Sequence, residues 1–272
     1  MKTRKQIVLL LLLFMVKCVN IAWGNTNSRH KEPVQLPTAD PRPSWVSMHI
    51  GPGYQFNAGD WSARYRSNAF LHAGAEYQHQ EKWLLGFDYM PYFSGNVRKD
   101  SMYGAMVGPS NYLFDINGNP AIIRTYLRGF NLSAVGGKIF PIRQSTSKNP
   151  RTLSFIAMGG MGFHEHYTKF EFDKGRLPQL EGLYETGHDN YRRGFSLSQQ
   201  FRLQYMNTET LSFTLGIHLM QSFTQNMRDW DMGTNRIPDR SQFDFTIGFN
   251  GGLIIPVNIG NSNGLKDADY LE

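Results

Sequence analysis

The stretch from Leu211 to Gln225, LSFTLGIHLMQSFTQ, carries a large apolar side chain at every odd position from 211 to 219. The positions between them are mostly small or polar. A period of two is that of a β-strand, whose successive side chains point to opposite faces. About ten residues of this pattern, with one fully apolar face, match a tilted strand that crosses a lipid bilayer.

The same period recurs along the chain and predicts eight strands. They span residues 45–56, 69–78, 83–93, 123–139, 153–167, 195–205, 211–225 and 243–257. Tight or short connections (79–82, 140–151, 207–210) alternate with moderate or long ones (57–68, 96–120, 168–192, 226–241). This alternation is typical of membrane barrels with short periplasmic turns and long extracellular loops. The predicted fold is all-β: an eight-stranded antiparallel up-and-down transmembrane β-barrel.

The first residues are predicted to be a signal peptide, residues 1–24. A basic segment, MKTRKQ, precedes an apolar segment of about ten residues, IVLLLLLFMV, and small residues flank the site before Asn25. The apolar segment is short for a membrane-spanning helix, and an uncleaved anchor is the alternative. Cys18 is the chain's only cysteine. Its loss with the leader would leave the mature chain without disulfide or thiol chemistry.

The remaining chain is predicted to form one domain in the bacterial outer membrane. Residues 25–44 read as a flexible N-terminal segment, 45–258 as the barrel and 259–272 as a short periplasmic tail. The formal charge of +6 includes four basic residues of the leader, so the mature chain is only weakly basic. Charge therefore gives no case for a nucleic-acid partner.

A soluble sandwich or lipocalin-like barrel also alternates apolar and polar positions. The polar face here is too rich in charge for a protein core, because it carries Glu76, Asp88, Arg202 and Asp244 together with His72 and His218. The apolar face carries aromatic rings near strand ends, as in an interfacial girdle. The rings are Trp83, Phe93, Phe195, Tyr205, Phe223 and Phe243.

These faces give two sets of predicted site residues. The lipid-facing set is Phe213, Leu215, Ile217, Phe245 and Ile247. The polar network of the lumen is Glu76, Asp88, Arg202, His218 and Asp244, with Arg202 paired to one of the three acids. An eight-stranded barrel is just wide enough to be filled by side chains, so a conducting porin is not expected.

The segment FHEHY places His164 and His166 on one face of a strand. Two histidines at this spacing are candidates for part of a metal site. The sequence supplies neither a fixed third ligand nor a Ser-His-acid arrangement, so these residues are interpreted as polar residues of the lumen. No catalytic residue, cofactor or metal site is predicted.

The last hundred or so residues resemble a family of small outer-membrane β-barrel proteins of the Bacteroidota. The resemblance rests on LPQLEG, YETGHDNYRRGFSLSQQFRLQYM, QSFTQNMRD and the closing FDFTIGFNGGLIIPV. It implies an eight-stranded barrel with a non-enzymatic envelope role. Some barrels of this size in that phylum are subunits of the type IX secretion apparatus or of barrel-assembly complexes. The chain departs from the proteobacterial pattern by ending in KDADYLE rather than in a terminal aromatic residue.

The sequence therefore predicts a non-enzymatic structural or accessory subunit of an envelope assembly. Its partners would be outer-membrane lipid and other envelope proteins, the latter contacted through the extracellular loops or the barrel wall. Two alternatives stay open: a lipid-A-modifying outer-membrane enzyme, and a soluble secreted β-barrel or sandwich that binds a ligand.

Overall fold

The computed structural model describes residues 44–79, 82–98, 112–144, 151–172, 176–207, 211–233, 235–238 and 241–257. The predicted signal peptide with Cys18, the predicted N-terminal segment up to residue 43 and the predicted tail lie outside these residues. No helix within the described part of the chain combines the length and apolar character needed to traverse a bilayer.

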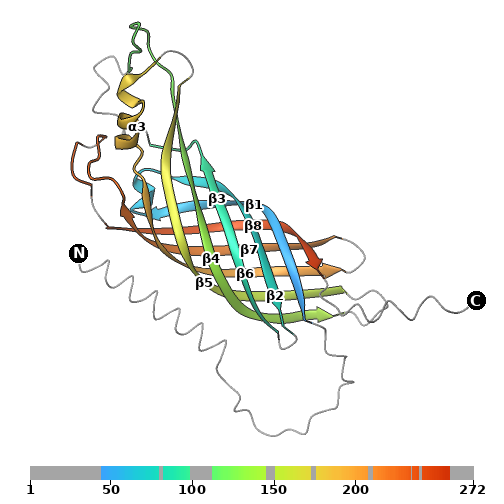
Figure 1. Ribbon diagram of the computed structural model, residues 1–272. Helices are drawn as coiled ribbons and strands as arrows, with labels where there is room; N and C mark the ends of the chain where they lie inside the picture. The colour runs from blue at the N-terminus through green and yellow to red at the C-terminus, as the bar shows by residue number, and fades with distance from the viewer. Residues whose placement is uncertain are drawn as a thin grey trace, which may run out of the picture. The chain divides into compact units, whose positions relative to one another are not determined.

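Eight antiparallel strands form a closed ring, in which each strand pairs with the next and β8 pairs with β1 (Figure 1). The strands are β1 (Trp45–Gly59), β2 (Ser67–Gln78), β3 (Trp83–Ser94), β4 (Ile123–Gln144), β5 (Arg151–Phe172), β6 (Arg192–Asn207), β7 (Ser212–Asn226) and β8 (Ser241–Val257). Each of the eight predicted strands is present, and the prediction of an all-β, eight-stranded antiparallel barrel is confirmed.

The two ends of the barrel differ in their connections. The start of β1 and the end of β8 pair at one end, where Val46 lies opposite Val257. We call this the turn end, because residues 79–82, 145–150 and 208–211 join strands there. The opposite end, the loop end, has the connections 60–66, 95–122, 173–191 and 227–240.

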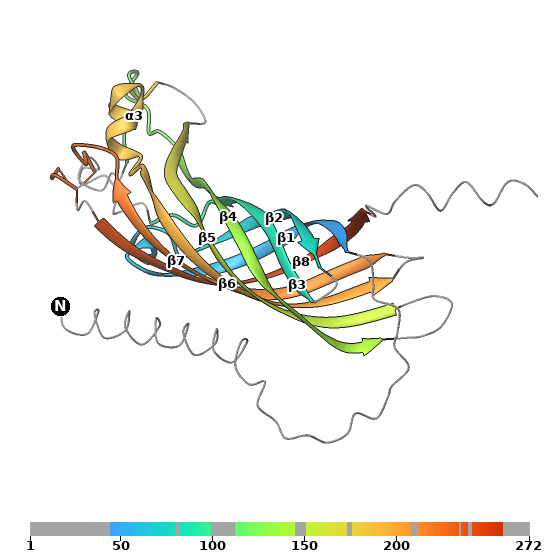
Figure 2. The same cartoon turned by 60° about the horizontal axis from the view of Figure 1, so that its bottom comes forward.

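Strands β4 and β5 run past the other strands at the loop end, where α3 (Leu183–His188) lies (Figures 1 and 2). There β4 begins at residue 123 as predicted, whereas β5 continues beyond its predicted end at residue 167 to Phe172. In this loop-end segment the apolar face of the two strands changes from the outer side to the inner side. Below this extension Leu132 and Phe163 are exposed on the outer face, whereas in it Leu127 and Phe170 are buried on the inner face. The outer face there carries the Lys169–Glu171 ion pair at 2.8 Å. The apolar band on the outer wall therefore ends where β4 and β5 extend past the other strands of the barrel.

An apolar cluster, which we call the plug, fills the lumen at the loop end and continues beneath the loops. Its members are Trp61, Tyr65, Phe70, Met90, Tyr92, Leu113, Ile123, Leu127, Phe170, Leu177, Leu180 and Met220. Gly59, with φ of 68°, turns the chain at the end of β1, and the following η1 (Trp61–Ala63) brings Trp61 into the cluster. The sequence pattern predicts a polar lumen throughout, and the plug departs from that prediction. Its apolar residues come from loops as well as from inward strand positions, so no single strand pattern indicates it.

The loops at the loop end are joined to one another. The Arg64 guanidinium after η1 donates to Asp231 in the β7–β8 connection, and the amide of Ile116 donates to Arg176 in the β5–β6 connection. Next to η3 (Pro178–Leu180), Arg176 also hydrogen-bonds Glu181 and holds the pKa of that carboxyl below its usual range. The described parts of the loops thus form one packed cap over the plug.

Candidate functional site in the barrel lumen

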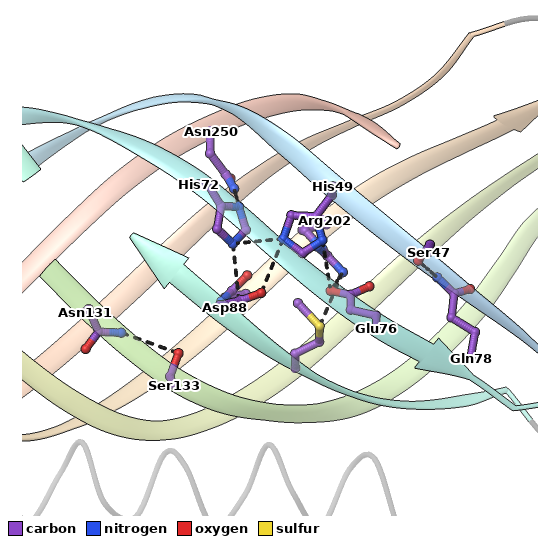
Figure 3. Close-up of polar contacts among 12 residues, drawn as sticks. Ser47, His49, His72, Glu76, Gln78, Asp88, Asn131, Ser133, Arg202 and Asn250 are labelled. Carbon is purple, nitrogen blue, oxygen red and sulfur yellow. Dashed lines mark hydrogen bonds and ion pairs between the residues drawn. The ribbon is translucent and has the colours of Figure 1, made fainter. Parts of the chain in front are cut away.

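Three side chains from three neighbouring strands meet in the middle of the lumen (Figure 3). His49 on β1 and Asp88 on β3 lie in one cross-strand row, because both pair with Gly74 on β2. His72 is the next inward residue of β2 beside Gly74. All three side chains are buried. The register of the sheet therefore builds this cluster, which we call the His–His–Asp triad.

The two imidazoles contact each other, and each contacts one oxygen of the Asp88 carboxylate. Nε2 of His49 lies 3.3 Å from Nε2 of His72. The carboxylate of Asp88 lies 3.3 Å from His49 through Oδ1 and 3.2 Å from His72 through Oδ2. Oδ1 of Asp88 has no hydrogen-bond partner in the described structure. A side chain at Gly74 would not fit, because its Cβ would lie 2.6 Å from both Asp88 Oδ1 and the His49 ring.

A second layer of polar groups surrounds the triad (Figure 3). The carboxamide of Asn250 lies 2.5 Å from Nδ1 of His72, and Gln200 donates to Oδ2 of Asp88 at 2.5 Å. The carboxylate of Glu76 lies 3.6 Å from Nδ1 of His49 and accepts a hydrogen bond of 2.5 Å from Arg202. His72 and Asp88 therefore have hydrogen-bond contacts to the second layer, and His49 faces the Glu76 carboxylate without a hydrogen bond.

The five residues of the predicted lumen network are all buried, but they lie in three places. Glu76, Arg202 and Asp88 belong to the triad and its second layer. His218 hydrogen-bonds Gln55 at 3.0 Å and packs against the ring of Phe70. Asp244 accepts from Thr224 at 2.9 Å nearer the loop end.

His164 and His166 form a separate cluster beneath the plug. Their rings contact each other at 3.2 Å between Nε2 of His164 and Nδ1 of His166, and Asp244 supplies a third potential ligand atom within 4.8 Å. The ring of Trp61 packs on both, at 5.0 and 4.9 Å between centroids. Aromatic packing rather than an ordered polar layer surrounds this pair, and its burial leaves it away from the outer wall, where a lipid substrate would lie.

The predicted lipid-facing residues lie on the outer face of β7 and β8. Phe213, Leu215, Ile217 and Ile247 are exposed, Leu215 by 62%, and Phe245 is half-buried. Large apolar side chains are exposed in the same way around the ring, including Ile50, Phe87 and Leu203. The outer wall also bears a groove of about 590 Å³ at the loop end, lined by Arg128, Phe130, Glu165 and Tyr167 among others.

The predicted lumen network omits His49, His72 and Gln200, although the sequence places His72 on the same polar face as Asp88. The usable signal was the tight 79–82 connection, which fixes the β2–β3 register and places Gly74 opposite Asp88. The longer connection between β1 and β2 does not fix the position of His49 in the same way. Residue order alone therefore could not reveal the triad.

The sequence matches no protein-family model, and no curated protein matches it significantly. Among solved structures, it is similar to Ail, the attachment invasion locus protein of Yersinia pestis, with a TM-score of 0.40, 12% identity, and coverage of 79% of this chain and 100% of that one. It is also similar to Neisserial surface protein A, with a TM-score of 0.38, 10% identity, and coverage of 79% and 99%. A structure of Ail with the heparin analogue sucrose octasulfate gives a TM-score of 0.35 at 12% identity, with coverage of 79% and 100%.

Proposed function

We propose that this chain is a non-enzymatic β-barrel of the outer membrane, closed to solutes, that contacts another envelope protein through its loop end. One observation supports the proposed location in the outer membrane. The ring exposes its large apolar side chains on the outside and buries charged and polar side chains inside. A soluble barrel would have the reverse arrangement, whereas hydrocarbon favours an apolar outer wall and a closed sheet without free edges.

The filled lumen supports a closed barrel. Trp61, Tyr65 and Tyr92 are almost fully buried in the plug, and Arg202 is almost fully buried beneath them. Side chains that are packed at this depth leave no continuous water column through the described part of the lumen. In planar bilayers the purified protein is expected to give no stable single-channel conductance, and regular conductance steps would reject the closed barrel.

The exposed apolar residues of the loops support a protein partner. Leu183 is exposed by 86%, and Ile116, Ile122, Tyr184 and Ile237 are also exposed at the loop end. Exposed apolar side chains outside the lipid-covered wall are typical of interaction sites. The resemblance to Bacteroidota barrels makes a subunit of a type IX secretion or barrel-assembly complex the finer form of this proposal.

Cell fractionation tests the location. The protein is expected in the outer-membrane fraction, resistant to carbonate extraction and shifted in gel mobility by heating. Release by carbonate alone would favour the soluble secreted alternative instead.

A photo-crosslinking residue at position 183 tests whether a partner protein contacts the loop end. The same residue at position 169, which is exposed on β5, is the matched control. A discrete protein adduct that depends on position 183 is expected. Its absence in cells that express the protein would remove the partner role. The enzymatic alternative is tested by mass spectrometry of lipid A from a deletion strain, in which an unchanged profile is expected and an altered one would replace the proposal.

A further inference from the structure

We propose that the His–His–Asp triad binds one zinc-type divalent metal ion inside the barrel. This inference uses the geometry of the lumen alone and holds wherever the barrel resides. It concerns His49, His72 and Asp88, and not the His164–His166 pair that the sequence suggested.

The distances within the triad suit a metal. Three ligand atoms about 3.3 Å apart can each lie about 2.0 Å from one ion at the centre of a tetrahedron, which is the length of Zn–N and Zn–O bonds. The two Nε2 atoms lie 3.3 Å apart, and each faces one oxygen of the Asp88 carboxylate, His49 facing Oδ1 at 3.3 Å and His72 facing Oδ2 at 3.2 Å. One ligand atom from each residue therefore lies within 4.8 Å of the other two. Two imidazoles and one carboxylate are ligands typical of zinc and of other first-row transition metals, and three protein ligands leave a fourth position for water.

The second layer fixes which atoms face the centre. A carboxamide can present its oxygen after a flip, so Asn250 can accept the Nδ1 proton of His72 across their 2.5 Å contact. On the other ring, the Glu76 carboxylate faces Nδ1 of His49 at 3.6 Å, without a hydrogen bond, and its negative charge favours the proton on that nitrogen. Both Nε2 atoms then carry lone pairs that point toward each other and toward the carboxylate of Asp88.

With both imidazole protons on Nδ1, the two Nε2 lone pairs and the Asp88 carboxylate repel one another unless a cation lies among them. In that tautomeric state a single added proton can bridge only one of the three contacts. A metal ion satisfies all three, including Oδ1 of Asp88, which has no hydrogen-bond partner in the described structure. Histidine ligands whose second nitrogen faces a carboxylate or a carbonyl oxygen are the usual arrangement in zinc sites.

Because the triad is buried, the experiment must supply the metal while the barrel folds. The triad lies beneath the plug, so the metal should enter while the barrel folds. The chain is refolded into vesicles with Zn²⁺ or Co²⁺, desalted, and its metal counted by mass spectrometry. About one ion per chain is expected, and binding should fall at least about tenfold in Asp88→Asn and His72→Gln.

Two matched variants separate this site from its neighbours. His218→Gln removes a buried lumen histidine outside the triad, and His166→Gln disrupts the second cluster; both should keep the metal. Heat-dependent gel mobility checks that each variant folds.

If neither triad variant folds, metal binding is measured in Glu76→Gln instead. Glu76 contacts His49 and no member of the His164–His166 cluster, so this variant affects the triad alone of the two sites. About tenfold weaker binding is expected. Three results would overturn the proposal: no metal in the unaltered barrel, loss of metal in His166→Gln with retention in His72→Gln, or unchanged affinity in a folded Glu76→Gln. The first would mean that a proton alone bridges the triad.

Discussion

Replacing Arg202 with leucine would leave the Glu76 carboxylate inside the barrel without its cationic partner. Each side chain is only 2% exposed, and their hydrogen bond measures 2.5 Å. The nearest other basic group is Nδ1 of His49, at 3.6 Å. Breaking a buried pair by removing one partner typically costs about 3–5 kcal/mol, because the remaining charge stays buried and unpaired.

The cost of protonating the stranded carboxylate gives a second estimate of the lost stability, of similar size, and adds a dependence on pH. The stranded carboxylate can escape its penalty by taking up a proton. Neutralising a glutamate at pH 7.4 costs about 4 kcal/mol, because its carboxyl in water titrates about three pH units lower. At pH 5 the same neutralisation costs only about 1 kcal/mol. The loss of stability in Arg202→Leu should therefore be large at pH 7.4 and shrink as the pH falls.

The assay is urea unfolding of the barrel in lipid vesicles, followed by tryptophan fluorescence and by heat-dependent gel mobility. EDTA is present throughout, so that a bound metal does not contribute. Arg193→Leu on the exposed face of β6 is the control, with an expected change within about 0.5 kcal/mol. The double variant Arg202→Leu, Glu76→Leu should be more stable than Arg202→Leu alone, because no buried charge remains. An unchanged midpoint at pH 7.4, or an equal loss at both pH values, would refute the reasoning.

Two further substitutions test the plug and the outer wall. Trp61→Ala should destabilise the barrel by about 3–5 kcal/mol, because it leaves a cavity in the plug. Trp230→Ala, at a half-exposed position, is the control in the same urea titration. Equal effects at both positions would contradict a packed plug. Leu215→Arg should cost about 2–4 kcal/mol in vesicles if it lies near the bilayer midplane, against little change for Ile237→Arg in a loop; vesicle-refolding yields that match for the two variants would argue against a lipid-covered wall at position 215.

The strands could be predicted because each carries its own evidence. A period of two in Leu211–Gln225 specifies a half-apolar strand without reference to any other part of the chain, and the alternation of short and long connections then orders the strands. The loop-end extension of β5 beyond residue 167 was missed because its apolar parity is inverted: Phe170 faces inward, while Lys169 faces outward.

The interior was harder to predict, because lumen contacts join strands that are distant in sequence. The sequence could place Glu76 and Arg202 on inward faces, but their contact depends on how β2 and β6 face each other across the lumen. The triad depends on two registers at once, those that place His49 and Asp88 opposite Gly74. Trp61 belongs to a short loop, where no periodicity indicates which way a side chain points.

The most direct test of the central claim asks what solvates the outer wall. Nitroxide labels are attached at Leu215→Cys, Ile217→Cys and, as a loop control, Ile237→Cys, in a chain whose one natural cysteine, Cys18, is replaced by serine. In vesicles, the labels at 215 and 217 should collide with oxygen but not with a water-soluble nickel complex, while the label at 237 should collide with the nickel complex. Labels at 215 and 217 that are reached by the nickel complex, or shielded from both reagents as in a dry protein interior, would contradict the account.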